Sequence, residues 1–128
     1  MRRIYMYKTD NCCPVNDFLD KADKKIKDKF FFCLDYLHDD KNCFIEPYVK
    51  HFSGGKFSRL YEVRVMALSK MVRVIFYEYN DNITFLHAFY KKTLKYTKTA
   101  LSVSLKILDS ITDKDGVVLE KYREELNF

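Results

Sequence analysis

Apolar positions follow two different periods along the chain, a helical period in the first third and a strand-like alternation in the middle. A short first helix is predicted to begin at Pro14, because the first turn of a helix tolerates proline. Its apolar face consists of residues at helical spacing: Val15, Phe18, Leu19 and Ala22. The pattern indicates a helix of about two turns.

A second helix is predicted over residues 24–38, directly after the first. Asp23 is a suitable N-terminal cap. The apolar face again has helical spacing, with Ile26, Phe30, Cys33 and Leu37. We therefore expect two helices packed against each other. Before them, residues 2–8 alternate in a way that predicts a short strand.

Three alternating runs predict an antiparallel meander, over residues 60–66, 71–79 and 83–90. A third helix is predicted to follow, with Thr97 or Thr99 as its cap and with Leu101, Leu105 and Leu108 on one face. We expect that helix to cover the sheet or its edge. The predicted fold class is α+β, with an N-terminal strand and a helical hairpin packed on a twisted antiparallel sheet, and with a C-terminal helix.

The end of the chain is short and charged. Val118, Tyr122 and Leu126 have helical spacing, so we expect this tail to be helical only when it is docked. No repeat, low-complexity tract or long linker divides the chain. The prediction is one folded domain over residues 1–111 and a tail over residues 112–128.

The alternation also predicts which side chains share a face of the sheet. Glu62 and Arg64 lie opposite the apolar residues of the first strand, and Arg73 joins them from the second strand. One face therefore packs on the helices, and the other collects three charged groups on neighbouring strands. Carboxylates and guanidinium groups so placed can form ion pairs.

The net charge of +5 hides an uneven distribution, because acidic residues gather near both ends and the middle is basic. A polyanion is expected to bind the middle, and nucleic acid is favoured over a membrane. No stretch is apolar enough to span a bilayer, and the N-terminal residues lack the apolar run of a signal peptide, so we expect a cytoplasmic protein. The cysteines have no CxxC spacing and the histidines are scattered, so no metal site, cofactor or disulfide framework is predicted.

Residues 83–98 combine a strand pattern with lysines, tyrosines and His87. Lysines attract phosphates, aromatic rings can stack on unpaired bases, and imidazole can move a proton near neutral pH. His87 shares its predicted face with Phe85 and Phe89, so a core role for it stays open. A Gly54-Gly55 loop between basic residues offers auxiliary backbone contacts. The candidates for RNA contact are Lys50, Lys56, Arg59, Tyr90, Lys91, Lys95, Tyr96 and Lys98.

An ordered set of short motifs resembles the RelE/ParE superfamily of toxins from type II toxin–antitoxin modules, with the greatest similarity to the HigB-like, phage-associated branch. The resemblance covers about residues 13–111. The motifs are Pro14-Val15 with Phe18-Leu19, Pro47-Tyr48-Val49-Lys50, Leu60-Tyr61-Glu62-Val63-Arg64, Val72-Arg73-Val74-Ile75-Phe76-Tyr77 and His87-Ala88-Phe89-Tyr90-Lys91-Lys92-Thr93.

The resemblance implies a small ribonuclease that cuts messenger RNA in the ribosomal aminoacyl site without a metal. A cognate antitoxin, expected to be a helix-turn-helix protein, would hold it inactive. Arg64 and Arg73 match the superfamily's basic residues on the central strands, and Lys91 or Lys92 matches the basic residue that ends the last strand. Glu62 stands where several ribonuclease members carry a lysine that acts as base. The proton acceptor is therefore open between Glu62 and His87, and Glu62 can instead neutralise the arginines.

Two other functions remain open. A ParE-like protein would inhibit DNA gyrase by binding, although Arg64, Arg73 and the Lys91-Lys92 pair favour the ribonuclease. A catalytically inactive protein would bind nucleic acid or an antitoxin only, for which Glu62 in place of lysine is the main support. Fold alone does not separate these functions.

Overall fold

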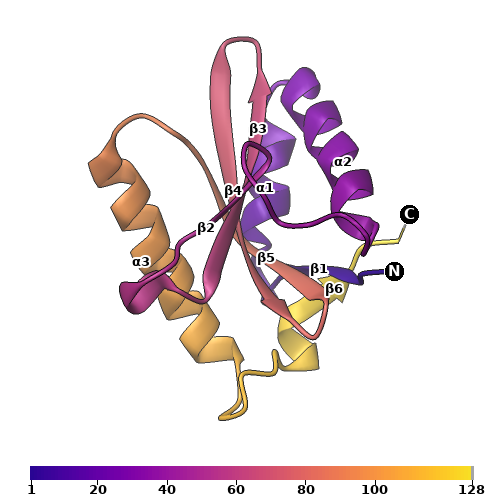
Figure 1. The fold of residues 1–128 in the computed structure, drawn as a ribbon, viewed down its shortest axis with the longest axis vertical. Coiled ribbons are helices and arrows are strands. Elements are labelled where there is room, and N and C mark those ends of the chain that lie inside the picture. Colours follow the sequence, from indigo (N-terminus) through magenta and orange to yellow (C-terminus); the bar gives the residue numbers. More distant parts are fainter. Residues whose placement is uncertain (128) are drawn as a thin grey trace.

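The computed structural model describes residues 1–127 and contains one mixed sheet with helices on both of its faces (Figure 1). The strand order is β2-β3-β4-β5-β1-β6. The strands are β1 (Ile4–Tyr7), β2 (Val49–His51), β3 (Leu60–Ala67), β4 (Lys70–Tyr79), β5 (Asn82–Tyr90) and β6 (Arg123–Glu125). The helices are α1 (Pro14–Lys21), α2 (Lys24–His38) and α3 (Leu94–Ile111), with short 3-10 turns η1 (Gly55–Phe57) and η2 (Glu120–Tyr122). The predicted α+β fold class is confirmed.

The helical hairpin α1–α2 covers one face of the sheet. The Asp23 side chain accepts a hydrogen bond from the backbone N–H of Lys25 at 2.8 Å, so the predicted cap is confirmed. Ile26, Phe30 and Leu37 are fully buried as predicted, but Leu34 fills the position expected of Cys33, which is only partly buried. Their partners on the sheet are apolar residues that all point to this face: Val63, Val65, Val72, Val74, Phe76 and Phe85.

The meander β3–β4–β5 is antiparallel throughout, as predicted, and β1 lies parallel to β5. Its hairpins turn through Leu68-Ser69 and Asn80-Asp81, and each of these residues has a positive φ between 49° and 65°. Consecutive positive φ angles are the requirement of a tight two-residue hairpin turn. The short links therefore fix the register that aligns the charged side chains.

Helix α3 covers the other face and begins earlier than predicted. Thr93, rather than Thr97 or Thr99, caps it, and its side chain accepts a hydrogen bond from the backbone N–H of Tyr96 at 3.2 Å. Thr97 is instead buried inside the helix. The predicted coverage of the sheet is confirmed, because the helix packs onto β5 and β4 with a core that includes Leu101, Leu108, Ile75, Leu86 and Phe89.

The predicted parity of the last strand is wrong because β5 contains a bulge. Pairing with β4 shifts between Ile75 and Phe76, so that Ile75 faces His87 while Phe76 faces Phe85. An extra residue in one strand reverses the alternation beyond it. Phe85 therefore points to the helical hairpin, whereas His87 and Phe89 share the α3 side of the sheet.

The described part of the tail contains the short 3-10 turn η2 and the strand β6, in place of the expected helix. β6 pairs antiparallel with β1, and Val118 is buried against the core under α3. Glu124 and Glu125 are exposed on the last strand of the sheet. Helical spacing did not determine the structure of this short charged segment, because pairing with the open edge of β1 gives more backbone N–H and C=O groups a hydrogen-bond partner. The domain boundary at residue 111 stays a prediction.

Candidate nucleic-acid interface

The register of the sheet brings the predicted charged residues together on the face that α3 partly covers. Lys50 on β2 lies opposite Glu62 on β3, and Glu62 lies opposite Ile75, which in turn faces His87. Two residues further along β3, Arg64 lies opposite Arg73. Side chains of facing residues lie on the same side of a sheet. The Lys50, Glu62, Arg64, Arg73 and His87 side chains therefore form one set, called the charged face below.

Glu62 binds both arginines of the charged face. Its Oε1 lies 3.0 Å from Nη1 of Arg73 and 3.5 Å from Nε of Arg64. The Glu62 side chain is fully buried, and that of Arg73 is 7% exposed. Burial raises the pKa of Glu62, opposed by the positive charges of Arg73, Arg64 and Lys50. The ion pair that the sequence left open is thus present, and Oε2 of Glu62 has no hydrogen-bond partner among the described residues.

Arg64 is the arginine of the charged face that reaches the surface. Its side chain is 23% exposed, and its Nη2 lies 3.5 Å from Glu46, an exposed carboxylate. An exposed pair of this kind is weak and is easily exchanged for another anion. Arg64 can therefore take up a phosphate, while Arg73 is held by Glu62 and can support it from beneath.

His87 lies in a cleft of ≈ 350 Å³ between β5 and the start of α3. The cleft also includes Phe89, Thr93, Lys95 and Tyr96. Burial lowers the pKa of His87, so its imidazole is neutral at pH 7. The ring is half-buried and stacks on Phe89 with 6.2 Å between centroids. His87 therefore lies neither in the closed core, a role that the sequence had left undecided, nor on the freely exposed surface.

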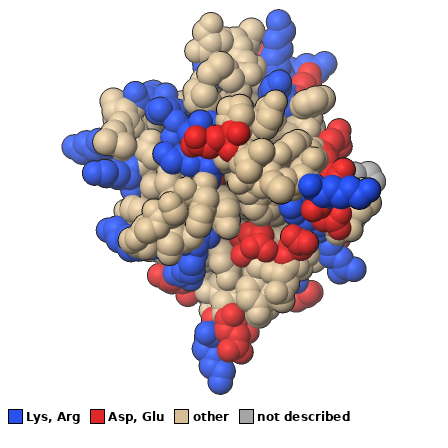
Figure 2. All heavy atoms as spheres, viewed as in Figure 1, with Lys and Arg blue, Asp and Glu red and all other residues tan. Residues whose placement is uncertain are grey.

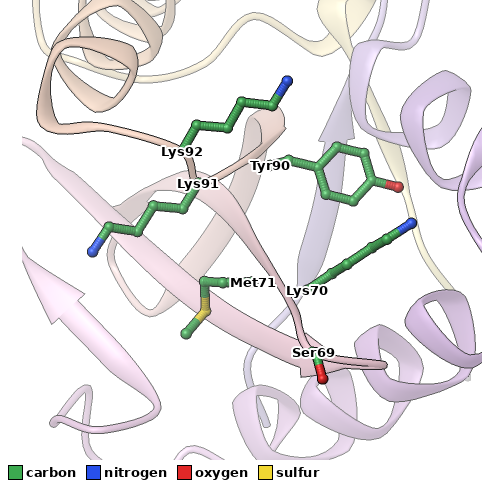
Figure 3. Close-up of a pocket in the computed structure, with 6 residues that line it drawn as sticks. All are labelled: Ser69, Lys70, Met71, Tyr90, Lys91 and Lys92. Atoms are coloured by element: carbon green, nitrogen blue, oxygen red, sulfur yellow. The ribbon is translucent and has the colours of Figure 1, made fainter.

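A second cleft, of ≈ 380 Å³, lies where β5 ends beside the β3–β4 turn. Lys70, Tyr90, Lys91 and Lys92 line it with Ser69 and Met71. Figure 3 shows Lys70 and Tyr90 side by side, with Lys91 and Lys92 pointing away from them. The Tyr90 ring already packs against Phe18, with 4.9 Å between centroids, and lies 5.7 Å from Nζ of Lys70. The Tyr90 ring is therefore already used in packing, and the positive charge of the cleft comes from Lys70, Lys91 and Lys92.

The start of α3 adds further positive charge. Lys92 Nζ lies 5.6 Å from the centre of the Tyr96 ring. Because Lys92 lines the second cleft and Tyr96 lines the cleft of His87, this contact connects the two clefts. Lys95 and Lys98 are exposed, and the Tyr96 side chain is 49% exposed and can stack on a base. The N-terminal end of a helix carries a partial positive charge that favours phosphate.

The remaining candidates lie at the margin of the charged face. Lys50 is half-exposed on β2, and Lys56 is exposed on the η1 turn. Arg59 forms an exposed ion pair with Asp109 of α3 at 2.5 Å, a kind of contact that contributes little to stability. Figure 2 shows basic side chains gathered on the side where Figure 1 places α3 and β2, and more acidic ones toward β1 and β6.

Sequence reasoning missed Lys70, which lines the second cleft on the hairpin side of the sheet, and Glu46, which pairs with Arg64 of the charged face. Lys70 appeared to be a turn residue, although pairing the second and third strands places it beside the end of the last one. Glu46, the partner of Arg64, precedes β2 in a segment that gives no periodic signal. Within residues 1–127, no group of at least three His, Cys, Asp or Glu side chains is arranged as metal ligands. None of the helices in this described part has the length and apolar content that crossing a membrane requires.

A mixed sheet between a helical hairpin and a C-terminal helix, in this element order, defines an α+β protein of the RelE-like class. Residues 17–109 match the family described as Phage derived protein Gp49-like (DUF891), and the chain belongs to that family. The family is phage-derived, RelE-like and associated with toxin–antitoxin modules. A search among curated proteins finds no match.

Proposed function

We propose that this protein is the toxin of a type II toxin–antitoxin module, of the HigB-like branch, and that it cleaves messenger RNA on the ribosome without a metal. The observation that carries the proposal is the meeting of Arg64, Arg73 and His87 on one sheet face beside the lysine-rich start of α3. These groups correspond to the three needs of RNA cleavage, which are phosphate binding, a base and an acid.

The proposed reaction begins at the ribose 2′-hydroxyl. Neutral His87 takes its proton, and the 2′-oxygen then bonds to the adjacent phosphorus. Arg64, supported by Arg73, stabilises the extra negative charge on the phosphate oxygens. The bond from phosphorus to the 5′-oxygen breaks, and Lys92 gives that oxygen a proton. The products are a 2′,3′-cyclic phosphate and a free 5′-hydroxyl group.

Charge on the two sides of the molecule supports the proposed partners. The basic side suits messenger and ribosomal RNA. The acidic and apolar residues near α1 and β6 lie apart from it, so a helix-turn-helix antitoxin can bind one surface while it blocks the other. A ribosomal target implies action in the cytoplasm.

The test is a translation reaction on a defined messenger, with breaks mapped by primer extension. Arg64→Gln is expected to lower cleavage by about 100-fold, because one well-placed charged donor contributes roughly 3 kcal/mol to such a transition state. Arg59→Gln is the matched control, since Arg59 is bound to Asp109 at the margin. Equal cleavage by wild type and Arg64→Gln would contradict the role of Arg64.

A binding role without cleavage is the second candidate. This candidate is favoured by the Glu62–Arg73 ion pair, because the buried guanidinium of Arg73 then binds a carboxylate and not a phosphate. The same translation reaction distinguishes it, because this candidate gives no breaks in the wild type. Inhibition of gyrase supercoiling in the absence of breaks would support the ParE-like function instead.

A further inference from the structure

A small cavity lies where the β4–β5 turn meets the tail, on the side of the sheet that α3 partly covers. It has a volume of ≈ 140 Å³. Its polar lining comes from three places in the chain, with Tyr79 and Asn80 around the end of β4, Asn82 and Thr84 on β5, and Arg123 on β6. We propose that this cavity, called the Arg123 cavity below, binds one phosphate-sized oxyanion. The inference is independent of the proposed function, because the cavity shares no residue with the two basic clefts.

The pairing of the strands explains why these side chains meet. Arg123 on β6 faces Tyr7 on β1, and Thr84 on β5 faces Tyr77 on β4. Tyr7 and Tyr77 both pack in the core under α3, and facing residues lie on the same side of a sheet. Cζ of Arg123 lies 4.0 Å from the centre of the Tyr5 ring. Since Tyr5 in turn faces Thr84, the guanidinium extends across β1 toward β5.

The segment between α3 and β6 closes the cavity. Val117 and Val118 line it, and Val118 is buried. The Tyr77 hydroxyl donates a hydrogen bond to the carbonyl oxygen of Gly116 at 2.7 Å, which fastens this segment to β4. The cavity is therefore enclosed by paired strands and an anchored segment, so its donors are in place before a ligand enters.

Arg123 is short of acceptors for a largely buried cation. Its side chain is 16% exposed, and its Nη2 lies 3.1 Å from the carboxylate of Glu120, which is 91% exposed. An ion pair with so exposed a partner is weak, because water screens it. Nε of Arg123 is buried and has no hydrogen-bond partner among the described residues. Buried charges are normally paired, and an anion in the cavity supplies the missing counter-charge.

The lining of the cavity favours a negative ligand. None of the described residues that line it is an aspartate or a glutamate. Asparagine amides, tyrosine and threonine hydroxyls and a guanidinium can all donate hydrogen bonds. The only formal charge among them is the positive one of Arg123. The cavity therefore combines a cation with several donors and holds no carboxylate that would repel an anion.

Size and geometry select the kind of anion. A cavity of about 150 Å³ holds a molecule as large as benzene, so the ≈ 140 Å³ here suits one phosphate ion and excludes a nucleotide. The donors come from β4, β5 and β6 and so surround the ligand. A tetrahedral oxyanion accepts hydrogen bonds in all directions, whereas a carboxylate accepts them at one end. Guanidinium groups bind phosphate strongly, and phosphate is therefore favoured over a carboxylate.

The experiment is a calorimetric titration of the full-length protein with inorganic phosphate at neutral pH, with sodium chloride added to keep the ionic strength constant. Wild type is expected to bind one equivalent in this cavity. Arg123→Gln should weaken that binding by about tenfold or more, because it removes the charged donor. Asn82→Asp should weaken it at least as much, since it keeps the shape of the side chain and places a carboxylate in the cavity. Circular dichroism checks the fold of each variant.

Each variant has a control with the same change in net charge. Arg59→Gln removes an arginine that also pairs with an exposed carboxylate but does not line the cavity. Asn11→Asp adds a carboxylate at an exposed position outside it. Both controls are expected to bind phosphate as wild type does.

Three results would overturn the proposal. The first is no saturable binding by wild type, which would mean that the cavity holds only water. The second is binding that is lost in Arg64→Gln and retained in Arg123→Gln, because phosphate would then occupy the charged face. The third is acetate binding as strong as phosphate binding, which would overturn the assignment of phosphate. None of these results depends on RNA cleavage, so this inference and the proposed function can fail separately.

Discussion

Glu62 sets how much positive charge the charged face presents. It is fully buried and lies within ion-pair distance of both arginines. A buried carboxylate is costly to desolvate, and its guanidinium partners offset that cost only while the pairing is kept. Glu62 therefore fixes Arg73 in the sheet and leaves the more exposed Arg64 as the cation that can exchange partners.

Glu62→Leu is expected to destabilise the fold by about 3 kcal/mol, because it leaves the buried guanidinium of Arg73 without its carboxyl acceptor. Glu46→Leu is the matched control, because Glu46 is exposed and pairs with the same face through Arg64, and it should cost less than about 1 kcal/mol. Urea unfolding of both variants measures the difference. Similar losses in the two would contradict the structural role of Glu62.

The raised pKa of Glu62 also predicts a pH dependence. The unfolded chain releases this proton near pH 4.3, whereas the folded protein holds it to a higher pH. Stability should therefore fall as the pH rises from about 4.3 to the higher pKa of Glu62 in the folded protein, and then level off. Unfolding free energies over that range should show this contribution in wild type and not in Glu62→Gln, and identical pH profiles would contradict the raised value.

His87 is expected to govern the acidic limb of the cleavage profile. Burial lowers its pKa from 6.5, so activity should rise with pH through a value below 6.5 as the imidazole loses its proton. His87→Gln should remove that limb and lower the rate by about 100-fold. The control is His51→Gln, because His51 is exposed and is bound to the carbonyl of Ser58. An acidic limb that persists in His87→Gln would assign the base elsewhere.

At the scale of elements, the sequence predicted what local periodicity controls. The helical hairpin and the three strands of the meander follow their patterns, since apolar side chains at each period have a face to bury. The bulge in β5 could not be predicted, because it depends on pairing with β4, and it alone moves Phe85 away from the face of His87. The paired edge of β1, likewise, decides the structure of the tail. Residue charge and strand alternation were enough to predict the candidate site residues. The ion pairs among these residues could not be predicted, because they depend on how the strands align with one another.

Val118→Ala tests whether the tail is an integral element. Val118 is 5% exposed and packs in the core under α3, whereas the neighbouring Val117 is 36% exposed. Val118→Ala should therefore cost about 2 kcal/mol through lost burial and an unfilled cavity. Val117→Ala should change stability by no more than roughly 0.5 kcal/mol. Thermal and urea unfolding measure both, and equally small effects would mean that the segment around Val118 does not pack under α3.

At the scale of the whole molecule, the position of charge matters more than its sum. The net charge is only +5, but exposed lysines at the start of α3 lie beside the cleft of His87 on the charged face, while α2 carries exposed lysines on the hairpin face. Attraction between exposed charges weakens beyond about 10 Å in 0.1 M salt. Lysines on the two faces should therefore contribute very differently to RNA binding, although each adds the same charge.

Two triple variants with the same change in net charge test this argument. Lys92→Gln, Lys95→Gln and Lys98→Gln remove charge beside the charged face, and Lys24→Gln, Lys25→Gln and Lys29→Gln remove it from α2. Each lost phosphate contact lowers the salt dependence of single-stranded binding by about 0.7 in the logarithmic slope, so the first set should lower it by up to roughly 2. The α2 set should leave the slope nearly unchanged. Binding to a short single-stranded RNA over a series of salt concentrations gives both slopes. Equal slopes would mean that net charge alone attracts RNA, and the interface would then lie outside the α3 side of the sheet.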